Sequence, residues 1–120
     1  MITAKFEYSP KIGFISMAVN GHAGFAELGK DPVCAGASIL AVTVATVIKG
    51  MEAENKLEKK ANIISRGGRV VVTAKPKPEF FTEAFHAFYV GETGMQLLAA
   101  SYPKHIDFTP FVAPDEGDNI

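Results

Sequence analysis

The sequence of 120 residues contains one cysteine, Cys34, and therefore cannot form an internal disulfide. A lone thiol favours the reducing cytosol over a secreted location, and we expect a cytoplasmic protein. The N-terminal stretch MITAKFEYSP also lacks the apolar core and the small-residue cleavage site of a secretory signal. These absences argue against a secreted domain stabilised by disulfides.

An excess of charge of one sign and a long apolar run are missing as well. Twelve basic and thirteen acidic residues give a formal net charge of −1, so no broad basic surface predicts nucleic-acid binding. The longest charge-free apolar run, from Val33 to Ile48, is shorter than the roughly 20 residues that a membrane-spanning helix needs. We therefore expect no direct nucleic-acid partner and no membrane partner.

Metal and phosphate motifs are also absent from the sequence. One cysteine and three scattered histidines give no zinc-ligand spacing, and neither His86 nor His105 has an evident role. The glycine-rich stretch GHAGFAELG does not follow the GxGxxG order, and no GK[ST] follows it. We expect neither a metal nor another cofactor.

What the sequence does contain is a regular series of strand and helix patterns. Five segments are predicted to be strands: residues 2–8, 14–20, 61–67, 69–76 and 105–112. The turn residues of SPKIG join the first two strands, and Gly67-Gly68 joins the next two. Pro110, in the last strand, is suited to a sheet edge.

The first predicted helix has a strong start signal, because Asp31 suits the N-cap and Pro32 suits the first helical position. It extends to about Asn55. Apolar residues occur on all its sides from Ile39 to Ile48, which predicts that this helix is largely buried.

A second helix is predicted from about Glu79 to Ser101, where Gly91 and Gly94 could introduce a kink. Its aromatic residues could form a dimer surface or core, and core is the interpretation we favour: Phe80, Phe81, Phe85, Phe88 and Tyr89. The order ββαββαβ predicts an α+β fold over residues 1–120, in which two helices pack on a mostly antiparallel sheet of a single domain. The acidic C-terminal stretch APDEGDNI is expected to lie in solvent.

Cys34 is the first candidate functional residue. It lies at the third helical position, where the helix dipole and unpaired backbone N–H groups favour a thiolate and could also receive an oxyanion. A lone cysteine in an apolar helix is more often an inert core residue. The residue pattern leaves both interpretations open.

His22 is the second candidate, since small neighbours at Gly21, Ala23 and Gly24 leave room for a substrate beside it. An imidazole titrates near neutral pH and can activate a thiol such as that of Cys34. The segment between them carries glycines at 24 and 29, and it could be a lid or a plain connection.

Two further residues could support such a pair. Asp31 is interpreted first as the helix cap, and it could also orient His22 or bias its protonation. Ser38 follows Cys34 by four residues and shares its helix face. Its hydroxyl could bind a substrate carbonyl or bond back to its own helix.

The whole segment GHAGFAELGKDPVCAGAS, residues 21–38, resembles the signature of the bacterial ribosomal-processing cysteine protease family, the Prp family. The match consists of His22 followed by Ala23, then Gly29-x-Asp31-x-Val33-Cys34-Ala35, then Ser38. Gly21 before the histidine and Tyr102-Pro103 before the last strand fit the same family. Pro32 and Gly36 replace the usual Ile and Ala without touching the chemistry.

The resemblance implies a homodimeric, cytosolic cysteine endopeptidase with Cys34 as nucleophile, His22 as general base and Asp31 as a supporting residue. The loop from Ala23 to Lys30 would be a mobile cover. The substrate would be the precursor of large-subunit ribosomal protein number twenty-seven, whose short N-terminal extension is removed for ribosome assembly. It would bind extended, pairing with a strand edge near His22.

A second hypothesis from a different class is a ribosome-associated module without catalytic activity. In that case GHAG and the helix start would form a peptide or RNA contact. The near-neutral net charge of the sequence weighs against RNA as the main partner.

Overall fold

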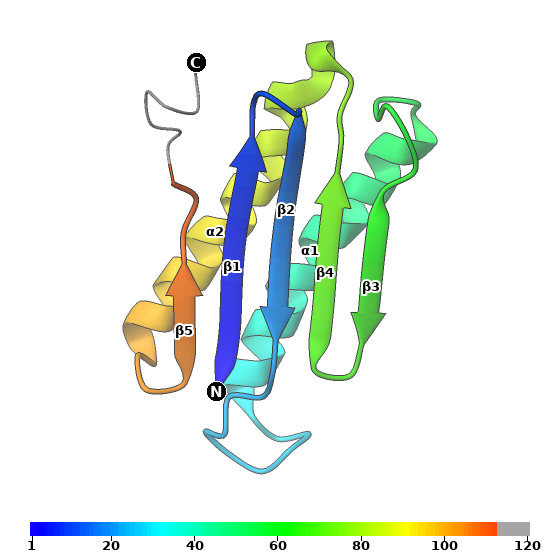
Figure 1. Cartoon of the computed structure of the whole chain (residues 1–120). Coiled ribbons are helices and arrows are strands. Elements are labelled where there is room, and N and C mark those ends of the chain that lie inside the picture. Colours follow the sequence, from blue (N-terminus) through cyan, green and yellow to red (C-terminus); the bar gives the residue numbers. More distant parts are fainter. Residues whose placement is uncertain (113–120) are drawn as a thin grey trace.

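The computed structural model describes residues 1–112, in which two helices cover one face of a five-stranded sheet (Figure 1). The predicted order ββαββαβ and the α+β class are confirmed. The elements are β1 (Ile2–Ser9), β2 (Phe14–Asn20), α1 (Pro32–Ala53), β3 (Asn62–Arg66), β4 (Arg69–Ala74), α2 (Phe81–Ser101) and β5 (Ile106–Thr109). The expectation for the stretch APDEGDNI lies outside the described residues.

The strands are arranged in the order β3-β4-β2-β1-β5. Three of the four neighbouring pairs are antiparallel, and only β1 and β5 run parallel, so the sheet is mostly antiparallel as predicted. β5 ends at Thr109, earlier than predicted, because the following Pro110 has no N–H for the ladder. It forms one edge of the sheet, and β3 forms the other.

Alternating burial fixes which face of the sheet meets the helices. Ile2, Ala4 and Phe6 of β1 are buried, and so are Ile15, Met17 and Val19 of β2 and Val70, Val72 and Ala74 of β4. Met17 pairs with Phe6 on one side and with Val72 on the other, so these residues form a continuous apolar layer. A one-residue slip would turn this layer to solvent, which specifies the register.

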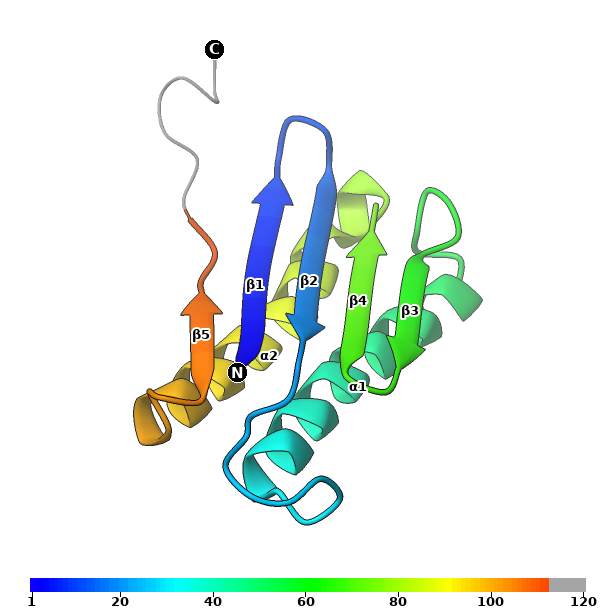
Figure 2. The same cartoon turned by 60° about the horizontal axis from the view of Figure 1, so that its bottom comes forward.

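α1 begins at Pro32 as predicted, but the prediction that it is largely buried is wrong. One side packs on the sheet and α2, whereas Ile39 is 65%, Val42 41% and Val47 45% exposed. The reason is that the described fold has two layers and no third layer covers the outer side of the helices (Figure 2). By length and hydropathy alone, α1 meets the criteria for a membrane-spanning helix. Core helices of soluble proteins meet the same criteria.

α2 runs unbroken through Gly91 and Gly94, so neither glycine interrupts the helix. These glycines lie where α1 and α2 approach each other. A Cβ at Gly91 would collide with the side chain of Val44, and one at Gly94 with the side chain of Leu40. Their lack of a side chain therefore lets the helices pack closely. Among the aromatic residues predicted for the core, Phe88 is buried but Tyr89 is 52% exposed.

Candidate active site

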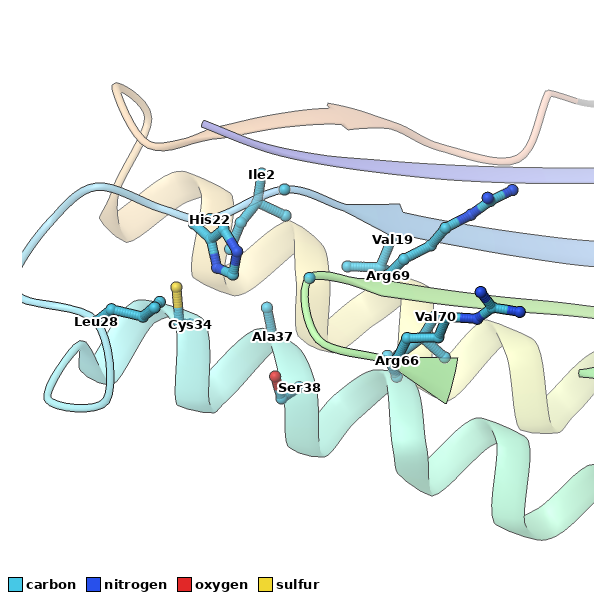
Figure 3. A pocket seen from close by; sticks show the side chains of 13 residues that line it. Ile2, Val19, His22, Leu28, Cys34, Ala37, Ser38, Arg66, Arg69 and Val70 are labelled. Atoms are coloured by element: carbon cyan, nitrogen blue, oxygen red, sulfur yellow. The ribbon is translucent and has the colours of Figure 1, made fainter. Parts of the chain in front are cut away.

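A pocket of about 190 Å³ opens at the end of the sheet where β2 leads into α1 (Figure 3). The loop before α1 and the turn between β3 and β4 reach this same end (Figure 1, Figure 2). Most of the lining comes from two parts of the chain, the segment from Gly21 to Ala41 and the β3–β4 hairpin, and Ile2 of β1 and Val19 of β2 complete it. The candidates Cys34, His22 and Ser38 all line it.

Cys34 is half-buried in the first turn of α1, and its sulfur accepts a hydrogen bond from the backbone N–H of Ala23 at 3.2 Å. The carbonyl of Ala23 lies 2.9 Å from Nδ1 of His105, which donates to it in the tautomer that carries the proton there. The peptide groups of Ala23 are thus held on both sides. His105, for which the sequence predicted no role, anchors the chain next to His22.

Asp31 is 5% exposed and accepts four backbone hydrogen bonds. Oδ1 binds the N–H groups of Val33 and Cys34 at 2.9 and 3.2 Å, which confirms the predicted helix cap. Oδ2 binds the N–H groups of Phe25 and Ala26 at 3.0 Å each. One carboxylate therefore fixes both the start of α1 and the loop that precedes it.

The pKa of Asp31 reflects two opposing effects. Desolvation by burial raises the pKa of this carboxyl, but the backbone N–H groups of Ala26, Cys34, Val33 and Phe25 lower it. The net pKa lies below the ordinary value of 3.8, so Asp31 is ionised at neutral pH.

The amides of the first helical turn, which were expected to be able to receive an oxyanion, are already bonded in this structure. The N–H groups of Val33 and Cys34 bind Oδ1 of Asp31, and that of Ala35 binds the Asp31 carbonyl at 3.0 Å. Proline at position 32 has no N–H. The backbone donor that faces the sulfur is instead the N–H of Ala23, which belongs to the loop.

His22 follows β2 and is exposed, and Figure 3 shows its ring and the sulfur of Cys34 pointing into the space between β2 and α1. Among the described residues no hydrogen bond joins the imidazole to the sulfur or to Asp31. Gly21 precedes it with φ +95°, and a Cβ at Gly21 would collide with the Met1 carbonyl. A side chain at position 21 would therefore displace the histidine.

The ring of His22 lies against the β3–β4 turn. A Cβ on Gly68 would be only 2.9 Å from Nε2 of His22 and 3.2 Å from Cε1, and Gly68 has φ +76°. The Gly68 carbonyl also accepts a hydrogen bond from the N–H of Gly21 at 2.8 Å. Gly68 was predicted only as part of a turn, and the structure shows that it also forms the surface on which the imidazole rests.

Ser38 and the loop complete the pocket. Ser38 is exposed one helical turn after Cys34, with its hydroxyl on the pocket side (Figure 3). Leu28 of the loop also lines the pocket, on the side of Cys34 (Figure 3). Gly24 and Gly29 bracket the loop with φ +67° and +88°, the left-handed region that glycine adopts most easily.

Three residues of this region were missed by sequence reasoning besides His105: Arg66, Gly68 and Arg69 of the hairpin. The Gly67-Gly68 turn was visible in the sequence, but its contact with His22 depends on β4 pairing with β2. β2 is paired on both sides up to Asn20 and offers no free edge beside His22. The sheet edge at this pocket is that of β3, whose Arg66 lines it, so substrate pairing with a strand edge near His22 stays a prediction.

Within residues 1–112 no three His, Cys, Asp or Glu side chains are grouped so that they could hold a metal ion. The polar groups of the pocket are instead those of a thiol, an imidazole, a hydroxyl and two guanidinium groups. This set fits nucleophilic chemistry on a carbonyl substrate.

Comparison with known proteins gives the following relationships. Residues 1–107 match the family model described as cysteine protease Prp. No curated protein sequence matches the chain significantly. The fold is similar to that of an essential ribosomal processing protease Prp from S. aureus in complex with a covalently linked product peptide, with 23% identity, a TM-score of 0.72, and coverage of 93% of this chain and 100% of that chain.

Two further solved structures share the fold. The S. aureus protease in complex with a substrate peptide has 21% identity and a TM-score of 0.64, covering 93% of this chain and 100% of that one. A protein from Streptococcus mutans has 22% identity and a TM-score of 0.63, covering 93% of this chain and 96% of that one.

Proposed function

The chain belongs to the Prp family of cysteine proteases, and we propose that it removes the short N-terminal extension from the precursor of large-subunit ribosomal protein number twenty-seven. The observation that carries the proposal is the single pocket that Cys34, His22 and Ser38 share. Further support comes from the similar S. aureus processing protease, whose structures contain a substrate peptide and a covalently linked product peptide.

In the proposed mechanism His22 is the general base. It takes the proton of the Cys34 thiol, and the sulfur attacks the scissile carbonyl carbon to form a tetrahedral intermediate. The N–H of Ala23, which donates to the sulfur in the free protein, turns to the developing oxyanion, and the Ser38 hydroxyl is the second donor. The N–H of Ala23 is beside the sulfur before the substrate binds, and Ser38 lines the same pocket.

The intermediate then collapses by breaking the C–N bond. His22 gives its proton to the leaving amine, and the N-terminal extension stays bound to Cys34 as a thioester. Water, deprotonated by His22, attacks this thioester and releases the extension with a free carboxylate, while the thiol regains its proton. The chemistry is complete without a cofactor.

Asp31 is a positioning residue in this scheme, because its oxygens bind four backbone N–H groups and not the imidazole. It holds the start of α1 and the loop at a fixed separation, and therefore keeps Cys34 beside the N–H of Ala23. The loop between Gly24 and Gly29 is proposed as a cover that moves aside for the substrate.

We also propose that the protein is a homodimer. Ile39, Val42 and Val47 of α1 and Val90 and Leu97 of α2 are exposed. A groove of about 320 Å³ between the helices has no charged lining residue. A second copy is a suitable occupant, because a two-fold axis brings the same apolar face onto itself. Val47→Glu with Val90→Glu is expected to give monomers in sedimentation velocity, and an unchanged sedimentation coefficient would contradict this interface.

The proposed location is the reducing cytoplasm, because the thiol of Cys34 must stay reduced to act as a nucleophile. Cleavage that persists after treatment with hydrogen peroxide would contradict a thiol mechanism. Fractionation of cells that express the protein tests the location directly.

The protease proposal is tested with a peptide that spans the cleavage site of the precursor, under reducing conditions. Wild type is expected to cut it once, and Cys34→Ala and His22→Ala are each expected to lower kcat/KM by about 10⁴-fold or more. Gly50→Ala, in the same helix but with open space around it, is the folding control and keeps full activity. A wild type that binds the peptide without cutting it, with binding unchanged in Cys34→Ala, would favour the binding module instead.

A further inference from the structure

His105 lies in the turn between α2 and β5, at the same end of the molecule as the loop before α1 (Figure 1). Its backbone is bonded on both sides. The N–H of His105 donates to the carbonyl of Tyr102 at 3.0 Å, and its carbonyl accepts from the N–H of Ile2 at 2.9 Å. These bonds tie the residue to the end of α2 and to the start of β1. The imidazole is therefore carried by the sheet and the helix, and not by the loop that it contacts.

The half-buried ring of His105 is oriented by an aromatic neighbour from the loop. Phe25 packs edge-on against the imidazole, with ring centroids 5.3 Å apart and an angle of 82° between the planes, and it also packs against Tyr102 at 5.1 Å. The N–H of Phe25 is itself bound by Oδ2 of Asp31 at 3.0 Å. Because Phe25 is held in this way, it restrains rotation of the His105 ring.

Nδ1 of His105 lies 2.9 Å from the carbonyl oxygen of Ala23. A carbonyl oxygen can only accept, so the contact requires a ring that carries a proton on Nδ1. Ala23 is buried, and among residues 1–112 no other group donates to its carbonyl. Without His105 this carbonyl would be a buried acceptor with no partner, which is unfavourable.

The carbonyl and the N–H of Ala23 are separated by only two rotatable bonds. The N–H donates to the sulfur of Cys34 at 3.2 Å, so His105 and the sulfur hold Ala23 from opposite ends. Gly24 follows with φ +67° and open space where a Cβ would be, and it restricts the Ala23 carbonyl little. The direction of the Ala23 N–H therefore depends on the bond from His105.

Resting on the proposed protease function, we infer that His105 is a positioning residue for the reaction. By holding the carbonyl of Ala23, it keeps the Ala23 N–H directed at the space beside the Cys34 sulfur, where the oxyanion develops. A donor that is already oriented stabilises the transition state more than one that must first be ordered. His105 touches neither the substrate nor the reacting atoms, so its effect falls on kcat and not on substrate binding.

The first test is kinetic and uses the peptide that spans the cleavage site of the precursor. His105→Leu removes the donor and is expected to lower kcat about 30-fold with little change in KM. His105→Asn keeps an N–H donor close to the place of Nδ1, so kcat is expected to stay within about threefold of wild type. His86→Leu makes the same substitution at an exposed position of α2 and keeps the wild-type kcat. Binding of the peptide to Cys34→Ala should not change when His105→Leu is added.

The second test is made on the free protein and does not depend on cleavage. Long-range ¹H–¹⁵N spectra at about pH 8.5, where an ordinary imidazole is neutral, are expected to show His105 with its proton on Nδ1. The signal is assigned by its loss in His105→Asn. Hydrogen exchange of the Ala23 amide should be about tenfold faster in His105→Leu than in wild type, and close to wild type in His105→Asn.

The inference is overturned if neutral His105 carries its proton on Nε2, or if His105→Leu leaves both kcat and the exchange of the Ala23 amide unchanged. It is also overturned if His105→Asn loses as much kcat as His105→Leu although circular dichroism shows both to be folded. A wild type that cuts no peptide would contradict the proposed function instead. The spectra and the exchange rates would then still decide whether His105 orients Ala23.

Discussion

The pocket has two walls of different origin. One wall, called the local wall, is the stretch of chain from Gly21 to Ala41, in which Asp31 holds both the helix start and the loop. The other wall is the β3–β4 hairpin, which lies about thirty residues later in the sequence and meets the first through Gly68 and His22. The first wall carries Cys34 and His22, the proposed reacting groups, and the second wall lies against the ring of His22.

This difference shows where the orientation of the imidazole comes from. The carboxylate oxygens of Asp31, near Cys34, accept hydrogen bonds from backbone N–H groups only. Among the described residues His22 therefore has no carboxylate partner. The hairpin turn restrains the ring by contact instead. Substitutions in the local wall and in the β3–β4 hairpin, called the distant wall, are therefore expected to change activity by different amounts.

Of the substitutions that compare the two walls, Gly68→Ala in the β3–β4 hairpin is expected to have the largest effect. The added Cβ would lie 2.9 Å from Nε2 of His22, so the ring must move. We expect this movement of the His22 ring to lower kcat/KM by about 100-fold, with a smaller change in KM, because a misplaced base affects the chemical step. Steady-state kinetics with the precursor peptide measure it.

Two glycine variants control this experiment. Gly67→Ala, the neighbouring turn residue, has open space around its Cβ, and it should keep activity. Gly13→Ala, in the β1–β2 hairpin, carries the same backbone strain at φ +82° without contact to His22. If Gly68→Ala is as active as Gly13→Ala, the hairpin does not position the imidazole.

A smaller effect is expected in the local wall from Asp31→Asn. Asparagine is a good N-cap, and its carbonyl oxygen can still accept from Val33 and Cys34. Its NH₂ group cannot accept from Phe25 and Ala26, so the loop loses its anchor while α1 keeps its start. We expect kcat/KM to fall roughly tenfold, with little change in helix content by circular dichroism.

For Asp31→Asn, unchanged activity would contradict the proposed role of the loop anchor. Full activity in Asp31→Asn would mean that the loop anchor is dispensable, and that the cap alone explains the aspartate.

The same residue predicts how stability depends on pH. The pKa of Asp31 is lower in the folded protein than its ordinary value of 3.8, so the folded state binds this proton less readily than the unfolded state. The carboxylate therefore stabilises the fold above pH 3.8, and this contribution is lost as the pH falls through the lower, folded pKa. Urea unfolding from about pH 5 to about pH 3 should show a steeper loss for wild type than for Asp31→Asn. Parallel curves would contradict a native-state shift at this group.

The smallest effect is expected from Gly36→Ala in the helix of the local wall. A Cβ there would make ordinary van der Waals contact with Leu98, 3.4 Å away. Alanine has the higher helix propensity, so the free energy of unfolding should rise by about 0.5–1 kcal/mol without a change in kcat/KM. Chemical denaturation measures the gain. A loss of stability would show that the helices have no room at this position.

Much of the local wall could be predicted from the sequence, because its signals act over a few residues. Asp31 and Pro32 fix where α1 begins, and that start puts Cys34 in the first turn. The strand patterns gave the order of elements for the same reason. The burial of α1 could not be predicted, because apolar residues on all sides of a helix do not indicate whether another layer of the protein covers its outer side.

The sequence by itself determined the elements and their order, because caps, turns and alternation are properties of neighbouring residues, and it predicted Cys34 and His22 as candidate reacting residues. Only the tertiary structure decided that β4 pairs with β2, and with it that Gly68 lies against His22 and that Arg66 and Arg69 belong to the pocket. It also decided that the amides of the first helical turn are occupied by Asp31 while the N–H of Ala23 faces the sulfur. Such contacts depend on how distant segments fold back on each other, which no pattern of adjacent residues records.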